Sequence, residues 1–150
     1  MKMMVDSNIL IFSNIADMPE YPLAREKLLA LIDQGYTFAV NTIIISEMNY
    51  KLQKILNNEE SHTRTKKLLH SRYFEYFPIE NNTLENAIDL SYASKMRIND
   101  ALIAQHCLDL GLDGIFTDNV KDFKKVPNLT IINLREGEKP NKGNTRSYDV

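Results

Sequence analysis

The chain has 150 residues, of which 43% are hydrophobic and 25% are charged. It is therefore long enough to bury a core and has the composition of one globular domain. Its formal net charge of -2 excludes a protein that coats nucleic acid by positive charge alone. No wholly apolar run approaches the roughly 18 residues of a membrane span, and Asp6 interrupts any N-terminal signal peptide. The single cysteine, Cys107, has no partner for a disulfide, so we expect a cytoplasmic protein.

Short apolar stretches alternate with amphipathic stretches along the first part of the chain. The pattern predicts strands at residues 2–5 and 36–40 and helices at about 21–34 and 42–56. Gly35 marks the end of the first helix, and Thr42 is predicted to cap the second.

The same alternation continues after a polar break at residues 57–60. A short helix is predicted up to residue 69, and an aromatic and polar alternation follows in which Pro78 indicates an edge strand or a strand end. The pattern then predicts two helices, at 83–95 and 99–110, followed by two strands, at 114–117 and 129–133.

Helices between short apolar strands are typical of a parallel sheet that is covered on both faces. We therefore predict a doubly wound, three-layer α/β/α fold with one domain at residues 1–134. Residues 135–150 are polar and contain almost nothing to bury, so they are predicted to form a poorly ordered tail.

Four acidic residues lie at predicted strand ends or on predicted helices: Asp6, Glu47, Asp100 and Asp118. In an open parallel sheet, ligands bind beyond the carboxyl ends of the strands, so these carboxylates are predicted to converge there. Their oxygens are the ligands that Mg²⁺ or Mn²⁺ prefers. A divalent ion in such a cluster lowers the pKa of a bound water and neutralises charge on a phosphodiester. The pattern therefore predicts metal-dependent phosphoryl chemistry.

Each acidic residue also has a purely structural interpretation. Asp6 could cap a helix, Asp100 could interact with a helix dipole, Glu47 could be a solvated helix residue, and Asp118 could belong to a turn. Only their joint placement indicates a site. Because clustered carboxylates repel one another without a cation, we expect at least one of them to have a raised pKa.

Several short motifs resemble those of the PIN-domain ribonucleases, in the same order and with suitable spacing over residues 1–134. They are the opening segment VDSNIL at 5–10, the pair Ser46-Glu47, the segment NDALIA at 99–104, the segment FTDNVKDF at 116–123 and a closing strand at 129–134.

This resemblance implies a magnesium- or manganese-dependent endoribonuclease that hydrolyses RNA. Small single-domain members of the family are similar to the VapC-type toxins of toxin–antitoxin pairs. The resemblance therefore also implies a cognate antitoxin as a partner and a homodimer.

The resemblance assigns roles to individual side chains. Asp6, Glu47 and Asp100 match the family's acidic positions directly, with Asp6 and Asp100 as metal ligands and Glu47 as a ligand or a water-orienting base. The fourth acidic position stays open among three residues, with Asp118 as the first choice and Asn119 or Asp122 as alternatives.

Three further side chains beside these acids suit the binding of water or substrate: Ser7, Thr117 and Lys121. Ser7 and Thr117 offer hydroxyl groups. Lys121 begins a basic group with Lys124 and Lys125, which is either a phosphate contact or a solvated helix face.

Two other functions remain open from the sequence. Asn119 in place of an acid favours a catalytically silent PIN-like module that binds RNA or protein. A phosphatase with an aspartate nucleophile is less favoured, because Asn8 occupies the position two residues after Asp6 where such enzymes keep a second aspartate.

Overall fold

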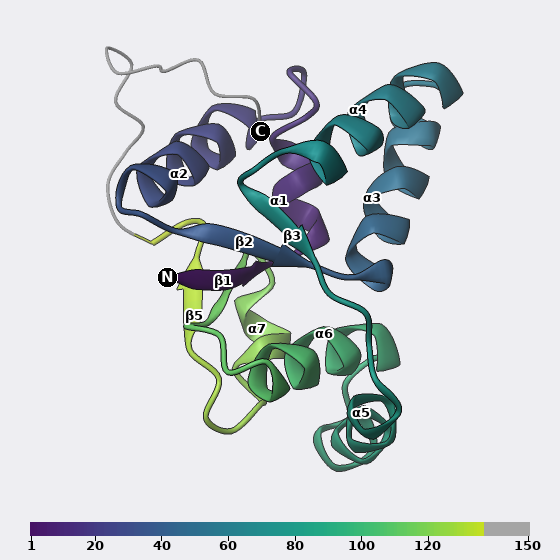
Figure 1. The fold of residues 1–150 in the computed structure, drawn as a ribbon, viewed down its shortest axis with the longest axis vertical. Helices are drawn as coiled ribbons and strands as arrows, with labels where there is room; N and C mark the ends of the chain where they lie inside the picture. The colour runs from purple at the N-terminus through teal and green to yellow at the C-terminus, as the bar shows by residue number, and fades with distance from the viewer. Residues whose placement is uncertain (137–150) are drawn as a thin grey trace.

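The computed structural model describes residues 1–136, which form an α/β fold around one five-stranded sheet (Figure 1). All neighbouring strands are parallel. In chain order, the strands are β1 (Lys2–Val5), β2 (Thr37–Val40), β3 (Phe74–Tyr76), β4 (Ile115–Thr117) and β5 (Ile131–Asn133).

The strand order is β3-β2-β1-β4-β5, so the chain builds the sheet outward from β1 in both directions. The winding direction therefore reverses between β1 and β4. In open α/β sheets this switch point leaves a crevice at the carboxyl ends of the strands, where ligands bind. The doubly wound fold predicted from the sequence is confirmed.

Helices cover the sheet on both sides: in Figure 1, α1 and α2 lie above it, and α5, α6 and α7 lie below it. The helices within residues 1–136 are α1 (Ser7–Phe12), α2 (Tyr21–Asp33), α3 (Thr42–Ile55), α4 (Asn58–His70), α5 (Asn81–Ser94), α6 (Ile98–Asp109) and α7 (Val120–Phe123).

The core lies where the central strands pack against these helices. Along β1, Met3, Met4 and Val5 are all buried. Because both faces of a doubly wound sheet are covered, a central strand is apolar at successive positions instead of alternating. Phe38 of β2 and Phe116 of β4 are fully buried beside it.

Two helices were missed by the sequence-based prediction, and one cap was placed on the wrong residue. The prediction assigned no helix to residues 7–12 or 120–123, which form α1 and α7. The cap of α3 is Asn41 instead of Thr42, because the Asn41 side chain accepts the backbone N–H of Ile44 at 3.0 Å and Thr42 is already helical. The remaining element boundaries agree to within a few residues.

The ends of the sheet and of the chain bear on two further predictions. β3 is an edge strand, as Pro78 indicated. The predicted tail at 135–150 falls mostly outside the described residues, but Arg135 itself is ion-paired to Asp118. Among residues 1–136, none of the helices has the length and apolar character needed to cross a membrane.

Gly114, which immediately precedes β4, is predicted to be intolerant of any side chain. Its φ is +154°, and an added Cβ would lie 2.7 Å from the carbonyl oxygen of Thr130. We expect Gly114→Ala to lower the free energy of unfolding by about 3 kcal/mol, because it adds backbone strain to a steric clash. Urea denaturation of the purified variant measures this loss.

Gly111→Ala is the matched control, because Gly111 has a φ of +64° but open space around the added Cβ. Its expected cost is only about 1 kcal/mol. Equal losses in the two variants would contradict the close packing of β4 against β5 at Gly114.

Candidate active site

Asp6 follows β1 directly and lies at the switch point of the sheet. Its backbone N–H donates to the carbonyl of Phe116 at 2.9 Å, which continues the pairing of β1 with β4. One carboxylate oxygen accepts the backbone N–H of Ser7 at 2.8 Å, and the other accepts the hydroxyl of Thr117 at 2.7 Å. Asp6 is only 4% exposed. It therefore caps α1, and it also presents a buried carboxylate at the crevice.

Glu47 of α3 and Asp6 are linked by Ser7, which hydrogen-bonds to both carboxylates. The Ser7 hydroxyl donates to Glu47 Oε1 at 3.0 Å, while the Ser7 backbone N–H binds Asp6. One residue at the start of α1 thus fixes two carboxylates that are far apart in the sequence.

Asp100 in the first turn of α6 is the third acid of the cluster. It is 8% exposed. Arg97 links it to Glu47, with Nη2 3.5 Å from Glu47 Oε2 and Nε 3.8 Å from Asp100 Oδ2. The guanidinium is the nearest positive charge to both acids among these contacts, and it is largely exposed.

The electrostatics of the cluster agree with the expected raised pKa. The pKa of Asp6 is raised to about 6: burial is the main cause, hydrogen bonds from Thr117 and Ser7 oppose the shift, and the charges of Asp100 and Glu47 add to it. The prediction is confirmed, but burial contributes more than repulsion does.

Asp100 is shifted in the same direction. Burial is the main cause of its raised pKa, the Arg97 charge opposes that shift, and the charges of Glu47 and Asp122 add to it. Asp122 of α7 is therefore close enough to act electrostatically on the cluster.

Asp118 has a different environment. Its carboxylate forms a bidentate ion pair with Arg135, in which Arg135 Nε lies 2.7 Å from Asp118 Oδ1 and Arg135 Nη2 lies 3.0 Å from Asp118 Oδ2. Arg135 also lies 3.2 Å from Glu20. The backbone N–H of Asn119 donates to the Thr117 hydroxyl at 2.9 Å, which orients the side chain that binds Asp6.

The predicted substrate-binding residues lie around this cluster. Ser7 and Thr117 make the hydrogen bonds to Asp6 described above, and Lys121 is exposed in α7 next to Asp122. Asp122 itself lies 3.6 Å from Lys125, which belongs to the same basic group.

The chemistry of the donor set fits a hard divalent cation. Carboxylate oxygens are the ligands that Mg²⁺ and Mn²⁺ prefer, and burial, which raises the pKa of both Asp6 and Asp100, makes their charged forms costly. Within residues 1–136, no group of three or more Asp, Glu, His or Cys side chains has the arrangement of a preformed metal site.

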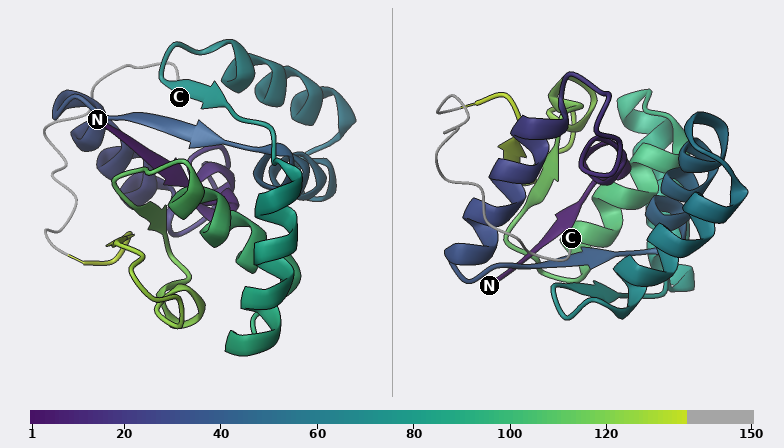
Figure 2. Two further views of the ribbon diagram at one scale, coloured as in Figure 1. Left: turned by 60° about the horizontal axis from the view of Figure 1, so that its bottom comes forward. Right: turned by 90° about the horizontal axis from the view of Figure 1, so that it is seen from above.

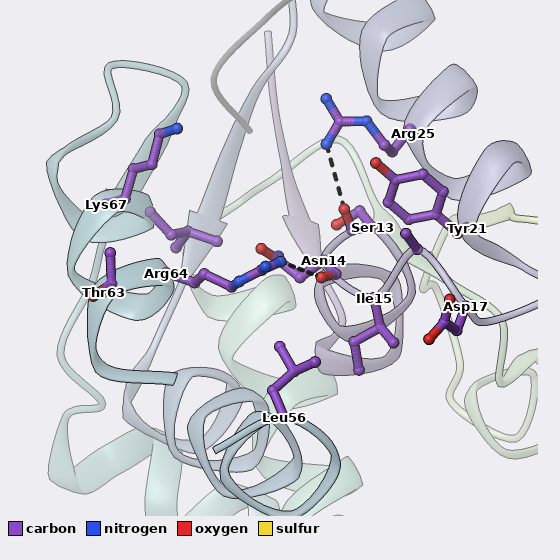
Figure 3. A pocket seen from close by; sticks show the side chains of 12 residues that line it. Ser13, Asn14, Ile15, Asp17, Tyr21, Arg25, Leu56, Thr63, Arg64 and Lys67 are labelled. Carbon is purple, nitrogen blue, oxygen red and sulfur yellow. Dashed lines mark hydrogen bonds between the residues drawn. The ribbon is translucent and has the colours of Figure 1, made fainter. Parts of the chain in front are cut away.

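A separate cavity of about 530 Å³ lies among the segment that follows α1 and helices α2, α3 and α4 (Figure 3). Its lining includes Arg25, Arg64 and Lys67 but none of the clustered acids. Arg64 donates to the backbone carbonyl of Asn14, and Arg25 donates to that of Ser13 at 3.3 Å. Arg64 therefore joins α4 to the segment that follows α1.

The PIN domain family model matches residues 3–129. The chain therefore belongs to the PIN domain family. It is 25% identical over 133 residues to Ribonuclease VapC2 of Rickettsia felis, and the match covers 87% of this chain and 96% of that protein.

Solved structures confirm the fold. The structure of VapBC2 from Rickettsia felis bound to a promoter DNA fragment aligns with a TM-score of 0.70 and 23% identity, covering 89% of this chain and 98% of the other. VapBC-1 from nontypeable Haemophilus influenzae aligns with a TM-score of 0.69 and 20% identity, covering 91% and 100%.

Stability should depend on pH through Asp6. Its folded pKa of about 6 exceeds the ordinary aspartate value of 3.8, so the stability it contributes is present below pH 3.8 and is lost as pH rises through 6. A gap of about 2 pKa units corresponds to about 3 kcal/mol. In metal-free buffer we therefore expect Asp6→Asn to be more stable than the wild type at neutral pH, with the difference vanishing near pH 4.

Thermal unfolding between pH 4 and 8 measures this effect, and asparagine keeps the helix-capping ability of residue 6. Asp17→Asn, at an exposed position outside the cluster, is the control and should show no such trend. A stability gain from Asp6→Asn that is the same at every pH would contradict the raised pKa.

Proposed function

We propose that this protein is a metal-dependent endoribonuclease that hydrolyses phosphodiester bonds of RNA. The observation that carries the proposal is the buried Asp6 carboxylate, with its raised pKa, beside Glu47 and Asp100 at the switch point of a PIN domain. The relative from Rickettsia felis, which is named a ribonuclease, supports the same activity.

Asp6 and Asp100 are the proposed primary ligands of Mg²⁺ or Mn²⁺, with Glu47 and one further acid completing the set. When bound, the ion supplies a water of lowered pKa and neutralises charge on the scissile phosphodiester. The raised pKa of Asp6 and Asp100 supports this assignment, because a cation would relieve the cost of burying their charges.

The chain's own residues position the reacting groups. Thr117 and the backbone of Ser7 hold Asp6 in one orientation, and the Ser7 hydroxyl holds Glu47. Glu47 is the proposed base that orients the attacking water and accepts its proton, because it is the more exposed neighbour of Asp6.

Two cations beside the acids are suited to the substrate backbone. Arg97 is largely exposed at the cluster, and Lys121 is exposed next to Asp122. Both are proposed to contact RNA phosphates. Such contacts would position the RNA strand without recognising its base sequence.

The biological role that we propose is the toxin of a type II toxin–antitoxin pair in the cytoplasm, held inactive by a cognate antitoxin. The fold supports this role, because a structure described as a toxin-antitoxin complex from Klebsiella pneumoniae aligns over 89% of this chain with a TM-score of 0.64. Identification of a small antitoxin gene beside the coding sequence would test this role.

The catalytically silent module is less well supported. Its rationale was Asn119 at the fourth acidic position, but Asp122 acts on the pKa of Asp100 and is available to provide that carboxylate. The first choice from the sequence, Asp118, is held by Arg135. We therefore propose Asp122 as the fourth acid in place of Asp118.

RNA cleavage tests the activity directly. The wild type should cleave single-stranded RNA with Mg²⁺ or Mn²⁺ and should lose activity with a chelator. Asp6→Asn and Asp100→Asn should each slow single-turnover cleavage at least about 100-fold, because each removes a proposed metal ligand. Cleavage that survives the chelator, or survives both substitutions, would overturn the mechanism.

Titration calorimetry with Mn²⁺ separates the candidates for the fourth acid. Asp122→Asn should weaken Mn²⁺ binding about tenfold or more, since it removes negative charge from the cluster. Asp118→Asn should leave Mn²⁺ binding unchanged and cost about 1 kcal/mol or less of stability, because it breaks only a surface ion pair. Asn119→Ala should also bind Mn²⁺ normally. The reverse ranking of Asp118→Asn and Asp122→Asn would restore Asp118 as the ligand.

A further inference from the structure

His106 of α6 is a buried, titratable side chain that the proposed mechanism does not use. It is 2% exposed, and its Nδ1 atom lies 3.0 Å from the side-chain nitrogen of Asn41, which is fully buried. The other ring nitrogen donates to the backbone carbonyl of Pro78, in the segment that joins β3 to α5. Because a buried polar group is costly unless it is hydrogen-bonded, loss of either partner would leave a buried atom unpaired.

The cap of α3 determines which ring nitrogen of His106 carries the proton. Asn41 Oδ1 accepts the backbone N–H of Ile44, so the amide presents Nδ2, which can only donate, to His106. Nδ1 of His106 is therefore the acceptor, and the proton of the neutral ring lies on Nε2, where it binds the Pro78 carbonyl. Burial lowers the pKa of His106, which favours the neutral ring.

This buried pair joins the two helices that supply Glu47 and Asp100. Asn41 caps α3, which carries Glu47, and His106 follows Asp100 on α6 by less than two turns. Helices α3 and α6 lie against each other, as both views of Figure 2 show. Arg97 also bridges the two acids, but it is largely exposed, so that ion pair holds them only weakly.

We propose that His106 is a positioning residue of the acidic cluster. Its hydrogen bond to Asn41 fixes the start of α3 against α6 and thereby sets the distance between the two acids. A buried bond between the helices keeps the acids near each other although their charges repel. His106 acts through α3 and α6 and not by contact with the cation. This role rests on the proposed function, because the distance between the acids matters only if they share a cation.

Nitrogen-15 NMR of the imidazole rings tests the hydrogen-bond arrangement without metal or RNA. In the wild type at pH 7, His106 should be neutral with its proton on Nε2. The exposed His62 and His70 provide reference signals in the same sample. A His106 ring that carries a proton on Nδ1 would overturn the arrangement and the proposal with it.

Asn41→Asp should change the protonation of His106 in a predictable way. Aspartate is also a good N-cap, so α3 keeps its cap, but a carboxylate cannot donate to Nδ1. The ring should therefore take up a second proton, on Nδ1, and become charged at pH 7. The charges of Asp109 and Glu80, which already raise the pKa of His106, favour this change. A ring that stays neutral in Asn41→Asp would contradict the contact.

Titration calorimetry with Mn²⁺ tests the positioning role. His106→Leu removes both hydrogen bonds of the ring and should weaken Mn²⁺ binding about tenfold. His106→Gln should bind Mn²⁺ nearly as tightly as the wild type, because the glutamine amide can accept from Asn41 and donate to Pro78. Rescue by glutamine separates the hydrogen bonds from the filling of space, since leucine also fills the site.

Thr83→Val is the matched control for a general loss of stability. Thr83 is buried, and its hydroxyl donates to Asp109 Oδ2 at 2.6 Å, so the substitution breaks a bond between α5 and α6 that does not involve α3. Thr83→Val and His106→Leu should both lower the melting temperature by about 5 °C. Only His106→Leu should weaken Mn²⁺ binding.

Asn41→Ser gives a second way to break the link, and it decides the question if His106→Leu does not fold. Serine still caps α3, but its side chain is shorter than the Asn41 amide and does not reach His106. It should therefore weaken Mn²⁺ binding as His106→Leu does.

The outcomes separate this role from the proposed function. Unchanged Mn²⁺ affinity in His106→Leu or Asn41→Ser, equal weakening in Thr83→Val, or no rescue by His106→Gln would overturn the positioning role alone. A wild type that binds no Mn²⁺ would overturn the proposed function and the positioning role together.

Discussion

The structure depends on a buried carboxylate at the end of its central strand. Asp6 is almost inaccessible, yet it is surrounded by the negative charges of Glu47 and Asp100. Two hydrogen bonds hold it in place, and burial raises its pKa to about 6. Burying charge without a partner is costly, and the proposed divalent cation would offset that cost.

The parallel sheet brings these acids together. Pairing of β1 with β4 places Asp6 beside Thr117, although 111 positions separate them in the chain. The start of α6 then supplies Asp100, and α3 supplies Glu47 through Ser7. A reversal of winding between β1 and β4 leaves this edge open to a ligand. The geometry thus links the fold to the proposed chemistry.

Much of this arrangement was predictable from the sequence, because apolar strands that end in acids indicate both a sheet and its functional edge. The helices α1 and α7 were missed because they contain only six and four residues, too few to show a helical repeat. The environment of Asp118 depends on Arg135, which lies 17 residues away beyond another strand.

Carbon-13 NMR of the aspartate carboxyl groups tests the central claim most directly. Without divalent ions, we predict that the Asp6 carboxyl titrates near pH 6, far above the ordinary aspartate value of 3.8. Diamagnetic Mg²⁺ should displace this titration to lower pH, because a bound cation favours the charged form. Titration of Asp6 near its ordinary pKa, unchanged by Mg²⁺, would contradict the account.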